Sequence, residues 1–327
     1  MKAALCTVPG RIEDVVVAEI EPPALPDDGL LVRVHAAGVN FPDLLLVRGQ
    51  YQEKPTPPFA PGLEVAGVVD AVGKDVTDFA PGDRVMATLR HGGFAEFAAV
   101  KAANAVKLPA TVSLDAAAAL PIAYGTAYHA FAQRARLEPG ETLLVLGAAG
   151  GVGLAAVELG RRFGARVIAV ASTVEKRAAA KAAGAHEAIG DEADQLAERV
   201  KALTDGRGAD VVFDPVGGDL FDQALRCVAP DGRVLVIGFA SGRIGELKAN
   251  RLLLKECGVL GVYWGAYARR KPAENAANFA RLIEWLEAGE LAPPIWRRFS
   301  LAEVPEALAA LANRQVIGKA IIAVRDA

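Results

Sequence analysis

The fold is decided by Thr142-Leu-Leu-Val-Leu-Gly-Ala-Ala-Gly-Gly-Val-Gly153, a short apolar run that ends in a turn rich in glycine and alanine. An uncharged run of this length predicts a strand buried on both faces. Residues 154–163 are small or apolar on one side and carry two arginines on the other, and Gly164 follows them, as is typical of a helix and its C-terminal glycine. A second apolar run, 166–171, comes at once. Strand, glycine turn, helix and strand in this order predict a dinucleotide-binding unit.

The turn departs from the G-x-G-x-x-G pattern, because Ala148 stands at the first glycine position. Small residues allow the backbone to approach a pyrophosphate, and the N-terminus of the next helix offers unpaired N–H groups and a positive dipole end. The alternative is a tight turn that binds nothing. The position of the glycine-rich turn, between two strands and before a helical pattern, favours binding. The cofactor contacts expected here are Ala149, Gly150, Gly151 and Val152.

The residues after the second strand indicate which dinucleotide binds. A free ribose 2′-hydroxyl usually meets an acid about 20 residues past the glycines, and no acid ends this strand, which closes in Ala171. Ser172 and Glu175 have the spacing of a capping box that begins the next helix. Lys176 and Arg177 then fall in its first turn, where the dipole disfavours cations unless an anion binds nearby. We expect Ser172, Lys176 and Arg177 to hold a 2′-phosphate, hence NADP(H), the alternative being an ordinary solvated Lys-Arg pair.

Composition excludes several classes of protein. A chain of 327 residues predicts one large domain or two medium ones. The net charge of −3 argues against a nucleic-acid or membrane-surface protein. Cys6, Cys227 and Cys257 are scattered, which predicts neither a disulfide framework nor a cysteine zinc site and fits a reducing compartment. No signal-peptide pattern and no run of about 18 uncharged apolar residues occurs, so we expect a cytoplasmic protein.

The pattern along the chain predicts three regions. Residues 1–121 are rich in short strands and turns, typical of a small β-barrel, and His35 in one of these strands is expected to pack rather than bind a ligand. Residues 122–264 alternate strand and helix, which predicts about six parallel strands in a doubly wound sheet. Residues 265–327 contain two helical stretches and a last strand, expected to return to the first domain. The strands expected in the first region are 2–7, 30–36, 65–72, 84–88 and 94–100.

Several further segments match a known family in this same order. They are Ala37-Gly-Val-Asn-Phe-Pro-Asp43, Gly49-Gln-Tyr51, Pro61-Gly-Leu-Glu-Val-Ala-Gly67, Pro81-Gly-Asp-Arg-Val85, Gly92-Gly-Phe-Ala-Glu96, Gly125-Thr-Ala127, Val262-Tyr-Trp-Gly-Ala266 and Gly318-Lys319. With the glycine turn, they resemble the medium-chain dehydrogenase/reductase superfamily, and within it the zinc-independent quinone oxidoreductases of the zeta-crystallin type. The resemblance covers the whole chain. It implies a GroES-like barrel domain followed by a Rossmann domain that binds NADP(H), in a homodimer.

The resemblance also bears on the chemistry. Zinc alcohol dehydrogenases of the superfamily carry Cys where this chain has Asn40 and His where it has Leu63, and their cluster of four cysteines is absent here. Zinc needs three or four such ligands, so we expect no metal and a simple hydride transfer from the reduced nicotinamide. A quinone fits as acceptor, since its oxyanions take protons from water. The alternatives are an α,β-unsaturated carbonyl or enoyl thioester, which needs polarisation and protonation, and an NADPH-binding protein with a structural or regulatory role.

By resemblance, Asn40 and Tyr51 line the nicotinamide end of the site. Asn40 would hydrogen-bond the carboxamide or the substrate carbonyl, and Tyr51 would donate its O–H or stack on a flat acceptor. The alternative for Tyr51 is a surface aromatic beside the loop 55–58. Thr126 is expected to contact the cofactor, the alternative being a helix cap.

The carboxyl ends of the fourth and fifth parallel strands give the remaining expected contacts, Gly217, Phe239, Ala240 and Ser241. The alternatives are that Gly217 only forms a turn and that Phe239 only packs. Arg314 and Lys319 either approach the cofactor or are solvated. The apolar segment 259–263 is expected to pair with its copy in a second subunit.

Overall fold

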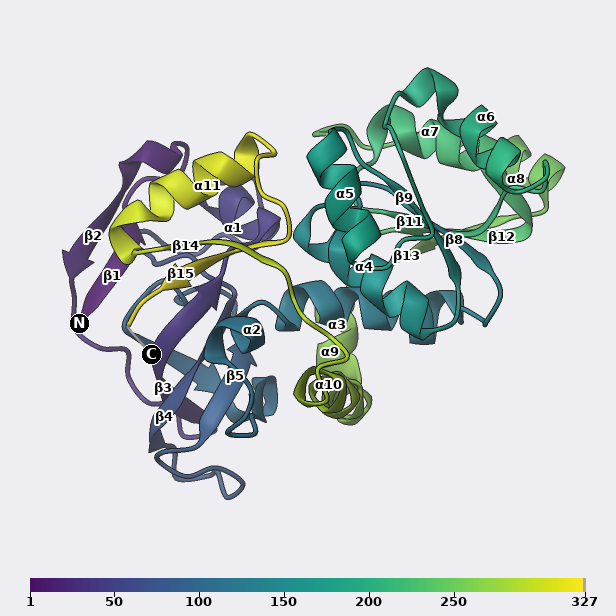
Figure 1. Cartoon of the computed structure of the whole chain (residues 1–327). Coiled ribbons are helices and arrows are strands. Elements are labelled where there is room, and N and C mark those ends of the chain that lie inside the picture. The colour runs from purple at the N-terminus through teal and green to yellow at the C-terminus, as the bar shows by residue number, and fades with distance from the viewer. Residues whose placement is uncertain (326–327) are drawn as a thin grey trace. The chain divides into compact units, whose positions relative to one another are not determined.

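The computed structural model describes residues 1–325, and the chain divides into two compact units (Figure 1). Unit 1 consists of Met1–Ile122 and Phe279–Ala327, and unit 2 of Ala123–Asn278. In Figure 1, unit 1 therefore contains both the purple and the yellow end of the chain. The expected C-terminal return includes residues 326 and 327, which lie outside the described residues.

Unit 1 is built on a seven-stranded sheet in the order β14-β15-β3-β4-β5-β7, with β6 also paired to β3. The strand β15 runs antiparallel to β3, so a strand from the C-terminal part of the chain joins this sheet, whereas β1 and β2 form a separate two-stranded sheet. The sequence did not predict β2, β7 or β14, of which β7 is only three residues long and β14 carries two arginines. The strands are β1 (Lys2–Cys6), β2 (Val15–Glu19), β3 (Gly29–Gly38), β4 (Glu64–Val72), β5 (Arg84–Thr88), β6 (Phe97–Lys101), β7 (Ala105–Lys107), β14 (Ile295–Phe299) and β15 (Lys319–Ala323).

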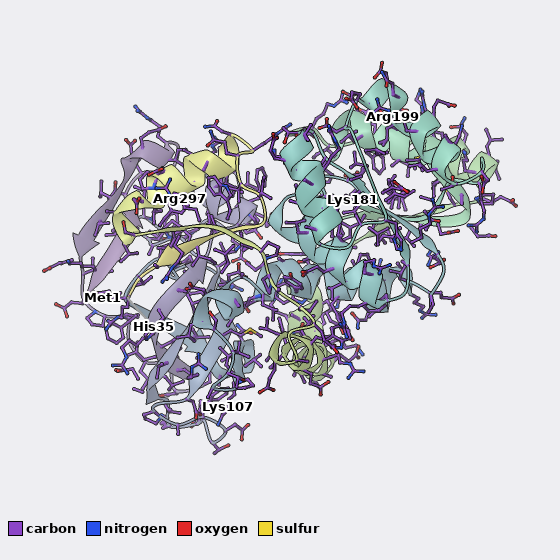
Figure 2. All side chains as sticks on the ribbon, in the orientation of Figure 1. Met1, His35, Lys107, Lys181, Arg199 and Arg297 are labelled. Atoms are coloured by element: carbon purple, nitrogen blue, oxygen red, sulfur yellow. The ribbon has the colours of Figure 1, made fainter. Side chains whose placement is uncertain are left out.

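Helices and the hydrophobic core complete unit 1. The inward side chains of β3, β4 and β15 pack with those of α11, including the fully buried Val34, Val65, Leu308 and Ile322. Side chains fill the interior of the unit, with charged ends such as that of Lys107 at the surface (Figure 2). The helices are α1 (Phe41–Val47), α2 (Leu114–Ala118), α10 (Pro272–Glu287), which crosses the boundary between the units, and α11 (Val304–Ala312).

Unit 2 is a doubly wound sheet of six parallel strands in the order β10-β9-β8-β11-β12-β13, which confirms the predicted fold class. The helix α4 packs on β8 and β9, and α7 on β11 and β12. The strands are β8 (Thr142–Val145), β9 (Arg166–Val170), β10 (Glu187–Ile189), β11 (Ala209–Asp214), β12 (Val228–Val236) and β13 (Gly258–Gly261). The helices are α3 (Pro121–His129), α4 (Gly151–Arg162), α5 (Val174–Ala182), α6 (Ala193–Leu203), α7 (Gly218–Cys227), α8 (Ala249–Lys255) and α9 (Trp264–Arg270).

Residues 265–278 pack with unit 2, although the sequence placed them in the C-terminal return. The indole N–H of Trp264 donates to Asn275 Oδ1 at 2.9 Å. The ring of Tyr267 stacks on His129, with centroids 3.9 Å apart. Buried aromatic contacts of this kind hold the segment to α3. The contact between Tyr267 and His129 cannot be read from sequence spacing, because these two residues lie far apart in the chain.

Among residues 1–325, none of the helices combines the length and the apolar character that crossing a bilayer requires.

Candidate functional site

The glycine turn of unit 2 is shaped for close approach of a ligand to the backbone. Gly147 has φ of +58°, a conformation that favours glycine. A Cβ on Gly153 would lie 2.3 Å from the carbonyl oxygen of Gly147, so the turn admits no side chain there. Helix α4 begins at Gly151, its N-cap Gly150 has no side chain to occupy the first N–H groups, and those groups suit a pyrophosphate.

The other expected contacts lie at the same edge of the sheet, because parallel strands end together. Gly217 follows β11 as the N-cap of α7, with φ of +69°. Its N–H donates to Asp214 Oδ1 at 2.8 Å. The N–H of Ser241 donates to the Val216 carbonyl at 3.0 Å, which ties the segment after β12 to the loop after β11. Phe239 is 38% exposed rather than packed in the core.

The end of β9 differs in one respect from the predicted arrangement. The N-cap of α5 is Thr173, whose hydroxyl accepts from the Lys176 N–H at 3.2 Å. The predicted capping box of Ser172 and Glu175 is therefore wrong by one residue, and Ser172 stays exposed at the end of the strand. The Arg177 guanidinium donates to the carbonyls of Ala171, at 3.2 Å, and Ser172, at 3.0 Å. This anchors a cation at the carboxyl end of β9.

Thr126 lies in the interior of α3, half-buried, three residues before the helix ends at His129 and well after its start. The alternative that its hydroxyl caps the helix is thus wrong. Its contact with a cofactor stays a prediction.

Unit 1 holds a buried charged cluster, which we call the Lys319 cluster, made of Lys319, Glu64 and Asn40. Lys319 Nζ lies 2.6 Å from Glu64 Oε1 and 2.7 Å from Asn40 Oδ1. The three residues are 3%, 0% and 7% exposed. Lys319 is therefore not a solvated residue. A buried ion pair persists only where its remaining hydrogen bonds are satisfied, and here Lys319 Nζ also reaches the Val39 carbonyl at 3.2 Å.

Both oxygens of the Glu64 carboxylate have partners, one from the backbone and the other from side chains. Oε2 accepts the N–H of Ile122 at 2.8 Å, and Oε1 accepts from both Lys319 and Asn40. A Cβ on Gly38 would lie 2.1 Å from Oε1, so only glycine fits beside the carboxylate. Every oxygen of this buried carboxylate is thus hydrogen-bonded.

Asn40 is held in one orientation by this cluster. Its Nδ2 group donates to Glu64 Oε1 at 2.8 Å and to the Gly38 carbonyl at 3.3 Å, and its Oδ1 accepts from Lys319. The Glu64 carboxylate requires a donor and the Lys319 ammonium requires an acceptor, so the Asn40 amide cannot be flipped to exchange its oxygen and nitrogen. Both Asn40 donors are used within the fold. The expected hydrogen bond from Asn40 to a ligand carbonyl stays a prediction that this geometry does not favour.

Asp43 fixes the backbone of the loop that contains Asn40. Its carboxylate accepts the N–H of Asn40 at 2.8 Å and that of Gly62 at 2.9 Å. Burial raises the pKa of Asp43 to about 7, although these two hydrogen bonds and Lys319 favour its charged form. Asp43 therefore joins the loop before α1 to the segment before β4.

Tyr51 is half-buried and packs against the hydrophobic core of unit 1. The sequence did not indicate Glu64 or Asp43 as functional residues, although both stand in segments that resemble the family. An acid at the start of an otherwise apolar strand was the available signal for Glu64.

A parallel sheet with a glycine turn in one unit, and a mostly antiparallel sheet with a buried charged cluster in the other, define a two-domain dehydrogenase or reductase that uses a dinucleotide. Residues 26–110 match the family model described as alcohol dehydrogenase GroES-like domain, and residues 151–286 that of zinc-binding dehydrogenase. Quinone oxidoreductase-like protein 2 of Bos taurus is 38% identical over 99% of this chain and 93% of its own length.

Solved structures agree with these relatives. A quinone oxidoreductase of Pseudomonas syringae superposes with a TM-score of 0.93 at 34% identity, covering 99% of both chains. The mycobacterial protein Rv1454c, solved in complex with NADPH, superposes with a TM-score of 0.93 at 30% identity, covering 99% of this chain and all of its own. The chain belongs to the quinone oxidoreductase family of enzymes in the medium-chain dehydrogenase/reductase superfamily.

Proposed function

We propose that this enzyme transfers a hydride from NADPH to a quinone without zinc. The observation that carries the proposal is the Lys319 cluster. Zinc enzymes of the superfamily place metal ligands where this chain has Asn40 and Leu63, and here the ammonium of Lys319 lies against Asn40 and Glu64. A metal ion next to Glu64 would meet this buried cation. NADPH oxidation measured with quinones, enones and enoyl thioesters tests the proposal.

The residues at the strand ends of unit 2 fit NADPH. The N–H groups at the start of α4 would bind the pyrophosphate, and the exposed Ser172 with the cations Lys176 and Arg177 would bind the 2′-phosphate. When bound, the reduced nicotinamide supplies a hydride. Gly217 and Phe239–Ser241 complete the expected contacts at this edge. The NADPH complex of the mycobacterial relative supports the assignment.

Within unit 1, the Lys319 cluster positions Asn40, and the Lys319 ammonium and the Asn40 amide are already hydrogen-bonded within the fold. Asn40 is fixed by Lys319 and Glu64, and its backbone is fixed by Asp43. These contacts hold the loop before α1 rigid, next to the segment that leads to Tyr51. A quinone needs no side-chain acid, because its oxyanions take protons from water. The arrangement therefore suits a quinone better than an enone, which needs a proton donor at carbon.

Purified protein is expected to contain no stoichiometric zinc. Each oxygen of Glu64 and the amide of Asn40 already have partners, and the described residues contain no group of three His, Cys, Asp or Glu side chains arranged to hold a metal. Elemental analysis and activity with and without a chelator measure this. Close to one zinc per chain, or activity lost on chelation and restored by zinc, would contradict it.

Tyr51→Phe is expected to retain most quinone turnover, while Tyr51→Ala raises KM. If the substrate is a quinone, the phenol ring only shapes the pocket, and the Phe variant keeps the ring. For an enone, a positioned acid typically contributes about 10²–10⁴ in rate. Steady-state kcat and KM of both variants distinguish the cases. A large loss of kcat in Tyr51→Phe, with unchanged NADPH affinity, would favour double-bond reduction.

We also propose a homodimer that forms through β13. This strand is the edge of the sheet in unit 2, and Leu253 and Leu254 of the neighbouring α8 are each 78% exposed. An unpaired edge beside exposed leucines is typical of a pairing surface. Sedimentation should give twice the 34.1 kDa chain mass. Changing both leucines to Asp should give monomers, whereas Val174→Asp on α5 should not. A monomeric wild-type protein would refute the proposal.

A further inference from the structure

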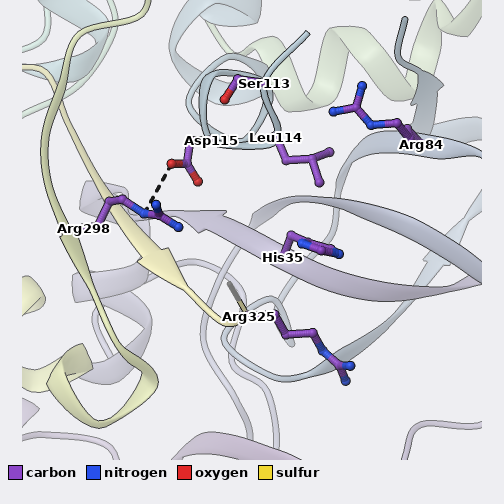
Figure 3. A pocket seen from close by; sticks show the side chains of 7 residues that line it. All are labelled: His35, Arg84, Ser113, Leu114, Asp115, Arg298 and Arg325. Carbon is purple, nitrogen blue, oxygen red and sulfur yellow. Dashed lines mark ion pairs between the residues drawn. The ribbon is translucent and has the colours of Figure 1, made fainter. Parts of the chain in front are cut away.

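Unit 1 contains a hollow of about 380 Å³ that is separate from the Lys319 cluster (Figure 3). Its walls come from β3, β5, β14, the start of α2 and the residues after β15. Figure 3 shows His35 between Leu114 and Arg325, with the paired Arg298 and Asp115 on one side and Arg84 on the other. The lining residues are His35, Arg84, Ser113, Leu114, Asp115, Arg298 and Arg325.

The hollow carries an excess of positive charge. Three guanidinium groups line it, and one carboxylate, that of Asp115, lies 3.3 Å from Arg298 Nε. Arg84 is fixed by hydrogen bonds to the carbonyls of residues 109, 110 and 112, at 2.6–2.7 Å, which hold its charge without neutralising it. Arg325 lies over the ring of Phe97, 5.1 Å from its centroid. Within residues 1–325, neither Arg84 nor Arg325 forms an ion pair with a carboxylate.

Two lining residues have unused hydrogen-bonding atoms. His35 Nδ1 and Arg325 Nε are buried, and they are the two buried side-chain nitrogen or oxygen atoms for which the described part of the chain offers no hydrogen-bond partner. Buried polar atoms nearly always have a partner, which is a water or an ion where the protein provides none. Both atoms belong to residues that line this one hollow, so the polar groups around it are not fully satisfied by the described part of the protein.

The charge balance indicates the class of occupant. Among the described lining residues, three guanidinium groups stand against one carboxylate, and a doubly charged oxyanion balances the net charge of the lining. Arginine is suited to such a group because its planar fork donates two parallel hydrogen bonds to neighbouring oxygens. Burial and the charges of Arg325, Arg33 and Arg84 lower the pKa of His35, so its neutral ring can donate without adding charge.

We propose that this hollow binds an oxyanion of the phosphate class, held by Arg298 and Arg325 from opposite ends of the β14–β15 segment, with Arg84 and His35 completing the wall. Sequence analysis assigned His35 to packing, because a lone histidine in a strand gives no indication of arginines distant in the chain. The proposed oxyanion site does not depend on whether the enzyme reduces a quinone.

The pKa of His35, measured with and without phosphate, tests the proposal directly. It is determined by NMR with and without inorganic phosphate at constant ionic strength, in protein saturated with NADP⁺ so that the cofactor site does not compete. Phosphate should raise the pKa of His35, because the anion offsets the surrounding cations. The pKa of His186, which lies near Arg161 and Lys181 in unit 2, should not follow. An unmoved His35, or equal changes at both histidines, would overturn the proposal.

Matched variants separate the site from general surface charge. Arg298→Gln and Arg325→Gln should each weaken phosphate binding roughly ten-fold or more, the usual loss for a hydrogen bond between charged groups. Arg297→Gln is the control, since Arg297 stands beside Arg298 in β14, pairs with Glu303 and Glu306, and does not line the hollow. Figure 2 labels both Arg297 and His35 in unit 1. Equal phosphate affinity in all three variants would overturn the proposal, and preserved melting temperatures exclude unfolding as the cause of a loss.

Discussion

Lys319→Met is expected to lower the free energy of unfolding by about 3–5 kcal/mol, the usual cost of removing one partner from a buried ion pair. Lys319 and Glu64 are 3% and 0% exposed, and their charged atoms lie 2.6 Å apart. Methionine keeps the unbranched stem of lysine as far as Cε but lacks the ammonium, so it leaves the Glu64 carboxylate buried without a cation. Urea unfolding measures the loss. Hydrogen exchange of β4 and β15 locates it in unit 1, which is needed because two units can unfold separately.

Two controls make this result specific. Adding Glu64→Gln to Lys319→Met removes the unpaired charge and should recover a large part of the loss. Lys101→Met removes a lysine of the same unit whose ion pair with Asp28, at 2.9 Å, is exposed, and exposed pairs contribute little. A Lys319→Met variant no less stable than Lys101→Met, or a double variant less stable than the single one, would show that the Lys319 cluster does not stabilise unit 1.

Lys176→Ala is expected to weaken NADPH binding roughly ten-fold or more and to leave NADH binding almost unchanged. A charge-assisted hydrogen bond to a phosphate contributes about 1.5–3 kcal/mol, and only NADPH carries the 2′-phosphate. Lys176 lies in the first turn of α5, beside the exposed Ser172 and the anchored guanidinium of Arg177. Isothermal titration with both cofactors measures the two affinities.

The control for this experiment lies on the same helix. Lys181 is in the last turn of α5 and donates to the His186 carbonyl at 2.5 Å, so Lys181→Ala should leave both affinities unchanged. If Lys176→Ala weakens NADPH and NADH equally, Lys176 supports the fold of α5 rather than the phosphate.

The sheet of unit 2 was predictable because its determinants are local. Apolar runs such as 142–146, a glycine turn and helical periodicity lie side by side in the sequence. The start of α5 was missed by one residue because Ser172 and Thr173 are both good caps, and the choice depends on the path of the chain after β9. The strand β14 was missed because its exposed Trp and Arg residues lack the alternation of a half-buried strand.

The sites were predictable only where their residues lie close together in the sequence. The glycine turn can be read directly, and the expected contacts of Ser172 and Lys176 depend on neighbouring residues. The Lys319 cluster joins residues that are 255 and 279 apart in the chain, so spacing gave no reason to expect that Lys319 is buried or that both Asn40 donors are used. The arginines around His35 come from both ends of unit 1 and posed the same difficulty.

The proposed quinone reaction is tested most directly by steady-state NADPH oxidation with simple quinones, enones and enoyl thioesters under identical conditions. Quinones need no side-chain acid, and the donor groups around Asn40 are already hydrogen-bonded within the Lys319 cluster. We predict that kcat/KM is highest for a quinone and that NADH supports the same reaction less well. A higher kcat/KM with an enone or an enoyl thioester would contradict the quinone assignment, and no turnover with any acceptor would contradict the proposed function as a whole.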